Sequence, residues 1–110
     1  MVNIEELKPL IIERLKPLNP DKIILFGSYA YGTPTEESDI DLFIQKEVDP
    51  SEISSLQVKA SVRLFDLIKK FQIGFDVFVD SKERALYRLN DVKDQFYHDI
   101  LQRGKEIYAK

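Results

Sequence analysis

The chain has 110 residues, of which 44% are hydrophobic and 32% are charged. This length fits a single compact domain over residues 1–110. The lack of cysteine excludes disulfides and thiolate chemistry, and a single histidine excludes multi-histidine metal sites. A net charge of −3 argues against direct nucleic-acid binding, and no apolar run is long enough to cross a membrane. We therefore expect a soluble, cytoplasmic domain.

Hydrophobic periodicity and turn residues predict alternating helices and strands. In chain order, the patterns predict a helix at 3–18, a strand at 22–26, a helical turn at 29–31, a strand at 39–44, a long helix at 51–71, a strand at 75–79, a short helix at 81–89 and a last amphipathic helix from 92 to about 104. Asn3 and Ser51 are the expected N-caps, and Pro9 is expected to kink the first helix or to begin it. The fold class is therefore α/β (α+β), with a small mixed sheet of at least three strands flanked by helices.

Asp39 and Asp41 alternate on the second predicted strand, so their side chains point to the same face about 7 Å apart. Two unpaired carboxylates at this distance repel each other by roughly 2 kcal/mol at an effective dielectric constant near 20. A divalent cation would offset the repulsion, because Mg²⁺ binds one or two carboxylates together with substrate phosphates. The alternative is that both side chains lie on a solvated strand face.

Gly27 and Ser28 follow directly after the first predicted strand. Glycine lets a ligand approach the backbone closely, and free N–H groups at the start of a helical turn favour phosphate. The Ser28 hydroxyl adds a further hydrogen-bond donor. The alternative is an ordinary strand-to-helix turn in which Ser28 is an N-cap.

Asp76 lies in the third predicted strand, between large apolar neighbours. A charge in such a strand is costly unless it is paired or binds a metal. If this strand neighbours the second one, three carboxylates could converge on one or two Mg²⁺ ions. Asp80 is the competing candidate because it shares the face of Asp76, and a solvent-facing edge residue is the alternative for Asp76 itself.

The combined pattern of strand, Gly27-Ser28, ten residues and Asp39-x-Asp41 resembles the nucleotidyltransferase superfamily that includes DNA polymerase beta. It is most similar to the smallest members, the minimal nucleotidyltransferases (MNT). The segment 96–108 also resembles the usual C-terminus of that family. The resemblance implies a polymerase beta-like fold, in which Gly27 and Ser28 hold a nucleoside triphosphate. It also implies that Asp39, Asp41 and Asp76 are catalytic and bind Mg²⁺, with two ions expected.

The turn after Gly-Ser departs from the family pattern. Many minimal members have arginines there, and those places are taken here by Tyr29 and Tyr31, which removes positive charge near the expected triphosphate. Lys59 and Arg63 would replace that charge only if their helix face turns toward the site; a solvated face is the alternative. His98 lies in the last predicted helix and is read as a surface or core-edge residue.

The resemblance also implies a function. The expected reaction transfers a nucleoside monophosphate, AMP if the substrate is ATP, onto a hydroxyl of a partner protein (AMPylation). Because 110 residues leave little room for an acceptor domain, a partner polypeptide is expected, with a possible hetero-oligomer. The family implies a HEPN-type RNase toxin, for which this chain would be the antitoxin. Two alternatives are a non-catalytic antitoxin that occludes its partner and a nucleotidyltransferase of small molecules such as aminoglycosides.

Overall fold

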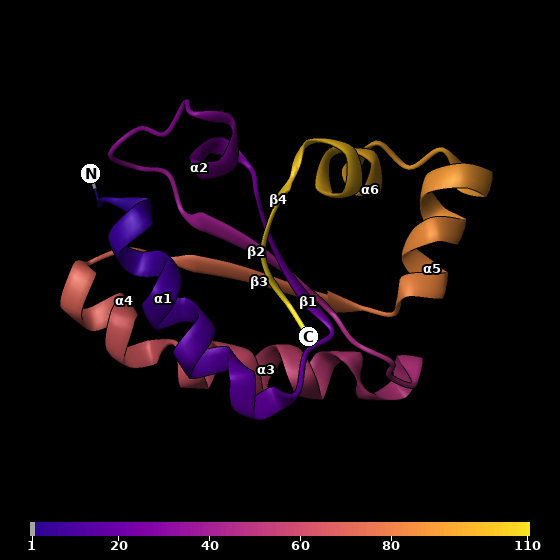
Figure 1. Ribbon diagram of the computed structural model, residues 1–110, viewed down its shortest axis with the longest axis horizontal. Helices are drawn as coiled ribbons and strands as arrows, with labels where there is room; N and C mark the ends of the chain where they lie inside the picture. The colour runs from indigo at the N-terminus through magenta and orange to yellow at the C-terminus, as the bar shows by residue number, and fades with distance from the viewer. Residues whose placement is uncertain (1) are drawn as a thin grey trace.

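A four-stranded mixed sheet forms the centre of the computed structural model, which describes residues 2–110 (Figure 1). The strands are β1 (Lys22–Phe26), β2 (Ile40–Gln45), β3 (Phe75–Asp80) and β4 (Lys105–Ala109). Their order across the sheet is β3-β2-β1-β4. Strand β1 is antiparallel to both β2 and β4, whereas β2 and β3 are parallel. The predicted fold class and the three predicted strands are confirmed.

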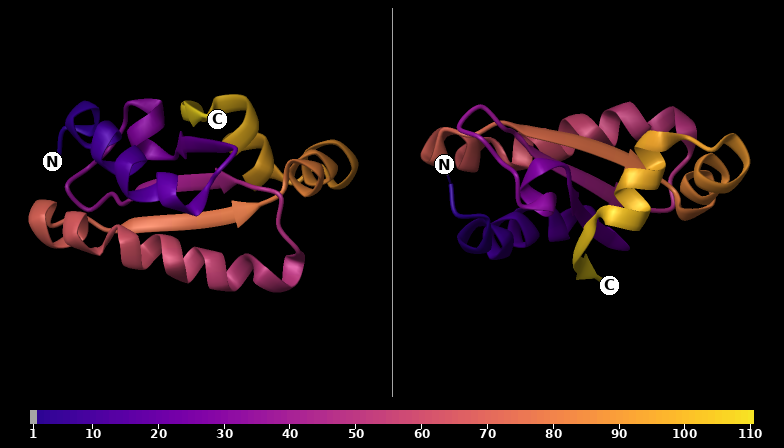
Figure 2. Two further views of the ribbon diagram at one scale, coloured as in Figure 1. Left: turned by 60° about the horizontal axis from the view of Figure 1, so that its bottom comes forward. Right: turned by 90° about the horizontal axis from the view of Figure 1, so that it is seen from above.

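Helices cover both faces of the sheet. They are α1 (Ile4–Leu15), α2 (Ser28–Tyr31), α3 (Ile53–Arg63), α4 (Phe65–Phe71), α5 (Lys82–Tyr87) and α6 (Gln95–His98). Short 3₁₀ turns at Lys16–Leu18 and Pro50–Glu52 and π-helical turns at Arg88–Val92 and Asp99–Arg103 extend them. Figure 2 shows α3 and α4 running alongside β3. None of the helices in residues 2–110 is long and apolar enough to cross a membrane.

The two faces of the sheet carry separate apolar clusters. On one face, fully buried Leu7 and Ile11 of α1 and Leu64 between α3 and α4 pack against alternate strand residues. On the other face, Phe26 at the end of β1 contacts Phe96 edge to face, with ring centroids 5.6 Å apart. Phe78 of β3 contacts Phe96 in the same manner at 5.0 Å. These aromatic contacts hold the segments that carry Gly27 and Asp76 in fixed positions.

The first helix begins as expected and continues through its proline. The Asn3 side chain accepts a hydrogen bond from the Glu5 N–H at 3.0 Å, which confirms Asn3 as the N-cap. Helix α1 includes Pro9 and so does not begin there. Buried Leu7 and Ile11 on either side of Pro9 hold the helix against the sheet, which offsets the missing backbone hydrogen bond.

Two details of the long predicted helix are wrong. Asp49 accepts hydrogen bonds from both the N–H and the hydroxyl of Ser51, so Asp49 and not Ser51 caps this segment. The helix is also interrupted at Leu64, which separates α3 from α4. No proline or glycine marks the break, and the fully buried Leu64 lies at the junction. Tertiary packing therefore decides the interruption.

The C-terminal segment contains a strand that periodicity did not predict. Strand β4 pairs antiparallel with β1, with an irregularity between Ile23 and Ile24. Its residues are mostly exposed or half-buried, so they show no strong apolar alternation. The helix predicted from 92 to about 104 is broken into α6 and a π-helical turn.

Candidate active site

The three acidic residues singled out in the sequence lie together at one end of the paired strands β2 and β3. Asp41 of β2 is the direct pairing partner of Asp76 in β3. Asp39 precedes β2 by one residue, and the Ile40 N–H donates to the Gly74 carbonyl at 2.9 Å, which anchors Asp39 beside the start of β3. Asp39 and Asp76 are exposed, while Asp41 is half-buried between them.

The carboxyl group of Asp41 is electrostatically strained. Burial, followed by the charge and a hydrogen bond of Asp76 and then the charge of Asp39, raises its pKa from 3.8 to about 6. A raised pKa means that the folded chain disfavours the charged form. The three carboxylates therefore concentrate negative charge. Among residues 2–110, no Lys, Arg or His side chain forms a salt bridge with any of them.

Two glycines make room for these carboxylates. Gly27 has φ 73° and ψ −162°, a combination essentially restricted to glycine, and a Cβ atom there would overlap the Asp41 carboxylate. At Gly74 a Cβ atom would lie 2.5 Å from Oδ1 of Asp39. Gly27 was predicted as a site residue and Gly74 was not, because the only sequence signal of Gly74 is its position before a predicted strand.

Ser28 begins the one-turn helix α2 directly after Gly27. The Gly27 carbonyl accepts hydrogen bonds from the N–H groups of Ala30 and Tyr31. By helix geometry, the first N–H groups of the turn, those of Ser28 and Tyr29, have no carbonyl partner within it. Together with the half-buried Ser28 hydroxyl, they present hydrogen-bond donors close to the acidic cluster.

The donor set suits a hard divalent cation. Asp39, Asp41 and Asp76 offer only carboxylate oxygens, which Mg²⁺ prefers, and the raised pKa of Asp41 shows that a positive charge would be favourable there. Among residues 2–110, however, no three acidic or histidine side chains already surround a common metal position. Mg²⁺ binding would therefore require these side chains to draw together around the ion.

The tyrosines that replace the family's arginines have structural contacts. Tyr29 is buried in the core, whereas Tyr31 is half-buried and its hydroxyl donates to the Asp99 carbonyl at 3.3 Å. The guanidinium carbon of Arg103 lies 3.9 Å from the centre of the Tyr31 ring. A cation from the C-terminal segment thus stands beside the turn, a contact that sequence spacing does not reveal.

Lys59 and Arg63 do not supply that charge. Arg63 turns toward α1, where its Nε donates to the Arg14 carbonyl. Lys59 and Arg63 together border a separate hollow with Leu18, next to the 3₁₀ turn after α1. Both side chains are exposed, in agreement with the solvated helix face given for them, because α3 packs on the opposite face of the sheet from the acids.

Asp80 and His98 also lie apart from the acidic cluster. Asp80 is 3% exposed and is held by Arg84 Nε at 2.9 Å and by the Tyr97 hydroxyl at 2.7 Å. These hydrogen bonds satisfy the Asp80 carboxylate, so its role is structural. His98 is exposed on α6, in agreement with its interpretation as a surface residue.

Comparison with known proteins decides the family. The model of the nucleotidyltransferase domain family matches residues 5–107. This chain belongs to that family and is a nucleotidyltransferase. The curated relatives include proteins of Methanocaldococcus jannaschii whose names propose a protein adenylyltransferase. One, MJ0604, is 37% identical over 87 residues, which cover 79% of this chain and 77% of that protein. Another, MJ0141, is 28% identical over 87 residues, which cover 79% of this chain and 78% of that protein.

Solved structures share the nucleotidyltransferase fold. A toxin–antitoxin crystal structure with AMP-PNP has a TM-score of 0.58 and 21% identity, covering 94% of this chain and 73% of that chain. A complex of a tri-AMPylated Shewanella oneidensis HEPN toxin with an MNT antitoxin has a TM-score of 0.52 and 18% identity. The match covers 96% of this chain and 72% of that chain. At these identities the likeness establishes the fold.

Proposed function

We propose that this nucleotidyltransferase transfers AMP from ATP to a hydroxyl group of a partner protein, with Mg²⁺ as cofactor. The observation that carries the proposal is the grouping of Asp39, Asp41 and Asp76 beside the Gly27 turn. The names of the archaeal relatives support a protein as the acceptor. The likeness to MNT antitoxins supports a HEPN-type toxin as the partner, with this chain as its antitoxin.

The residues divide into two groups with different tasks. Asp39 and Asp41 would hold Mg²⁺, with Asp76 completing a second metal site, and the bound cations would supply positive charge to the triphosphate. The Ser28 hydroxyl and the free N–H groups of the turn would donate hydrogen bonds to the β- or γ-phosphate. Catalysis of this kind depends mainly on positioning and on charge stabilisation.

Asp76 is placed to assist the acceptor. It is exposed and stands on β3, the outermost strand on that side of the sheet. The acceptor hydroxyl oxygen would attack the α-phosphorus, and its proton would pass to the Asp76 carboxylate. The bond between the α-phosphorus and the oxygen leading to the β-phosphorus would break, and pyrophosphate would leave.

A labelling experiment tests this function. The protein is incubated with Mg²⁺ and the product of the adjacent gene, using ATP labelled at either the α- or the γ-phosphate. We expect only the α-label to enter the partner, and we expect Asp41→Asn to abolish the transfer. Asp91→Asn is the matched control, because Asp91 is exposed on the π-helical turn Arg88–Val92, which carries none of the three site carboxylates.

Two other results would contradict the proposal. If Asp39→Asn and Asp41→Asn each still neutralise the partner, and no label enters the partner, the chain acts by occlusion. A labelled small molecule with no labelled protein would show that the acceptor is not a polypeptide.

A further inference from the structure

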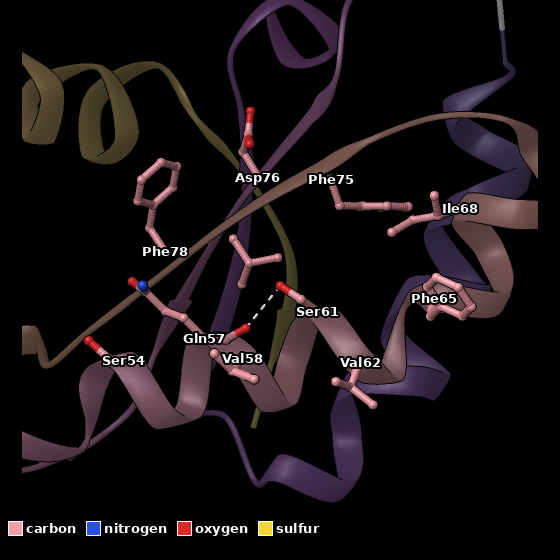
Figure 3. A pocket seen from close by; sticks show the side chains of 11 residues that line it. Ser54, Gln57, Val58, Ser61, Val62, Phe65, Ile68, Phe75, Asp76 and Phe78 are labelled. Atoms are coloured by element: carbon pink, nitrogen blue, oxygen red, sulfur yellow. Dashed lines mark hydrogen bonds between the residues drawn. The ribbon is translucent and has the colours of Figure 1, made fainter.

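An apolar groove of about 860 Å³ runs between α3 and the outer edge of β3 (Figure 3). On its helix side lie Val58, Val62 and Phe65, which are 63%, 69% and 57% exposed. Val77 lines its strand side, and Asp76 stands at its rim as its one charged lining residue. Large exposed apolar side chains gathered in one groove are typical of a surface that binds a partner.

The backbone of β3 offers unused hydrogen-bonding groups to this groove. The carbonyls of Gly74 and Asp80 accept hydrogen bonds from the N–H groups of Ile40 and Lys46 at 2.9 and 3.1 Å, so the main chain of these even-numbered residues faces β2. Main-chain direction alternates along a strand. The N–H and carbonyl groups of Val77 therefore face away from β2, toward the open edge of the sheet.

A side chain confirms the direction of this edge. The outward N–H of Val79 donates to Oε1 of Gln57 on α3 at 3.1 Å. Gln57 thus covers one end of the edge. Between Val79 and the acidic cluster, the side chain of Val77 is buried, and among residues 2–110 no side chain donates to or accepts from its outward main-chain groups. An open strand edge beside an apolar groove is the arrangement by which proteins bind extended peptides as an added strand.

We propose that the groove binds an extended segment of the acceptor protein, which pairs with the main chain of Val77 and lays apolar side chains against Val58, Val62 and Phe65. The segment's hydroxyl-bearing residue then lies beside Asp76. This assignment rests on the proposed transfer to a protein hydroxyl. It specifies the acceptor as a locally unfolded or strand-like segment with apolar residues on either side of the modified one.

The position of the groove favours a polypeptide over the nucleotide. Ser28 follows β1, two strands away from the edge of β3, or about 10 Å at the usual strand spacing. The three acids lie between that turn and the groove. Phosphate-binding groups and the groove therefore lie on opposite sides of the acidic cluster, as two substrates in an in-line transfer require.

Steady-state transfer to the adjacent-gene product tests the groove. Val62→Lys and Phe65→Ser alter exposed side chains and should not disturb folding. We expect each to raise the KM for the partner about tenfold or more and to leave the affinity for a non-hydrolysable ATP analogue unchanged. Tyr87→Ser is the matched control, because Tyr87 is an aromatic residue 58% exposed on α5, outside the groove.

Amide hydrogen exchange tests the added strand. In the free protein the Val77 N–H should exchange rapidly, whereas the N–H groups of Asp76 and Phe78, which face β2, should be protected. Binding of the partner should slow exchange at Val77 and leave the two neighbours unchanged.

The outcomes separate this proposal from the proposed function. If the wild-type protein transfers no label to the partner, both the proposed function and the groove assignment are contradicted. If label transfer proceeds but the groove variants keep a wild-type KM, or Val77 stays unprotected in the complex, only the groove assignment is overturned. A concentration-dependent dimer that Val62→Lys dissociates would also overturn it, because the groove would then be covered by a second copy of this chain.

Discussion

Asp41 and Asp76 occupy directly paired positions on the parallel strands β2 and β3, so two carboxylates face the same small region, and neither forms a salt bridge within residues 2–110. Burial and the neighbouring charges raise the pKa of Asp41 to about 6. A fold selected for stability alone would not keep this arrangement, because removing either charge would relieve the repulsion. Binding of a cation by the two carboxylates would explain why both charges are kept at these positions.

Asp41→Asn should stabilise the metal-free protein at alkaline pH. The pKa of Asp41 is higher in the folded chain than its ordinary value of 3.8, so the folded state of the wild type loses stability as the pH rises from about 4 to about 6. With a discount for partial solvent exposure, we expect the variant to be more stable by about 1 kcal/mol at pH 8, or roughly 5 °C in Tm. At pH 4 the difference should largely vanish. Thermal melts of the two proteins without metal check this, and a less stable variant at pH 8 would contradict it.

Mg²⁺ should stabilise the wild-type protein through the same carboxylates. At ten times its Kd a ligand raises the free energy of unfolding by about 1.4 kcal/mol. The increase in Tm should be larger at pH 8 than at pH 5, because Asp41 must be ionised to bind the ion. Calorimetry with and without Mg²⁺ measures the effect. An equal increase in Asp41→Asn would show that the ion binds elsewhere.

Gly74→Ala should impair activity more than stability. The added Cβ would lie 2.5 Å from Oδ1 of Asp39, and the end of that exposed side chain can move away at little cost. We expect Tm to change by only a few degrees and the rate of transfer to fall about tenfold or more, because displaced catalytic groups are costly. Transfer assays at saturating ATP check this. Full activity would show that Asp39 does not need its present position.

Tyr97→Phe should destabilise the fold without affecting nucleotide binding. The lost hydroxyl donates to Oδ2 of Asp80, a carboxylate only 3% exposed, and burial followed by this contact raises the pKa of Tyr97. An unsatisfied buried acceptor costs about 1–3 kcal/mol. The midpoint of urea unfolding should therefore decrease. Tyr87→Phe, at an exposed tyrosine, is the control, and an equal loss there would refute the explanation.

Arg103→Gln should weaken nucleotide binding. Arg103 stacks on Tyr31 at the end of α2, about one helical turn from Ser28, and so places a positive charge beside the turn that we propose to bind phosphate. We expect the Kd for ATP in the presence of Mg²⁺ to increase several-fold, with little change in Tm. Titration calorimetry measures both proteins. Arg88→Gln, on a separate exposed turn, is the control, and an unchanged Kd for Arg103→Gln would exclude this role.

Elements with strong local patterns were predictable. The buried run at β1 and the amphipathic α1 with its Asn3 cap depend on neighbouring residues in the chain, so their signals are local. The interruption at Leu64 and the strand β4 were not predictable, since both depend on packing against distant segments. A partly exposed edge strand needs no apolar alternation and therefore leaves little trace in the sequence.

The candidate site divides in the same way. Gly27-Ser28 and Asp39-x-Asp41 lie in one short stretch, and residue spacing alone predicts that a glycine turn, a hydroxyl and two same-facing carboxylates lie close together. That Asp76 rather than Asp80 lies beside them follows from the pairing of β2 with β3, which sets the positions of the two strands that lie side by side. The same long-range packing brings Arg103 to Tyr31, turns Arg63 toward α1 and leaves the outer main chain of Val77 without a neighbouring strand. Residue spacing fixes which side chains share a face, whereas contacts between distant segments fix which faces meet.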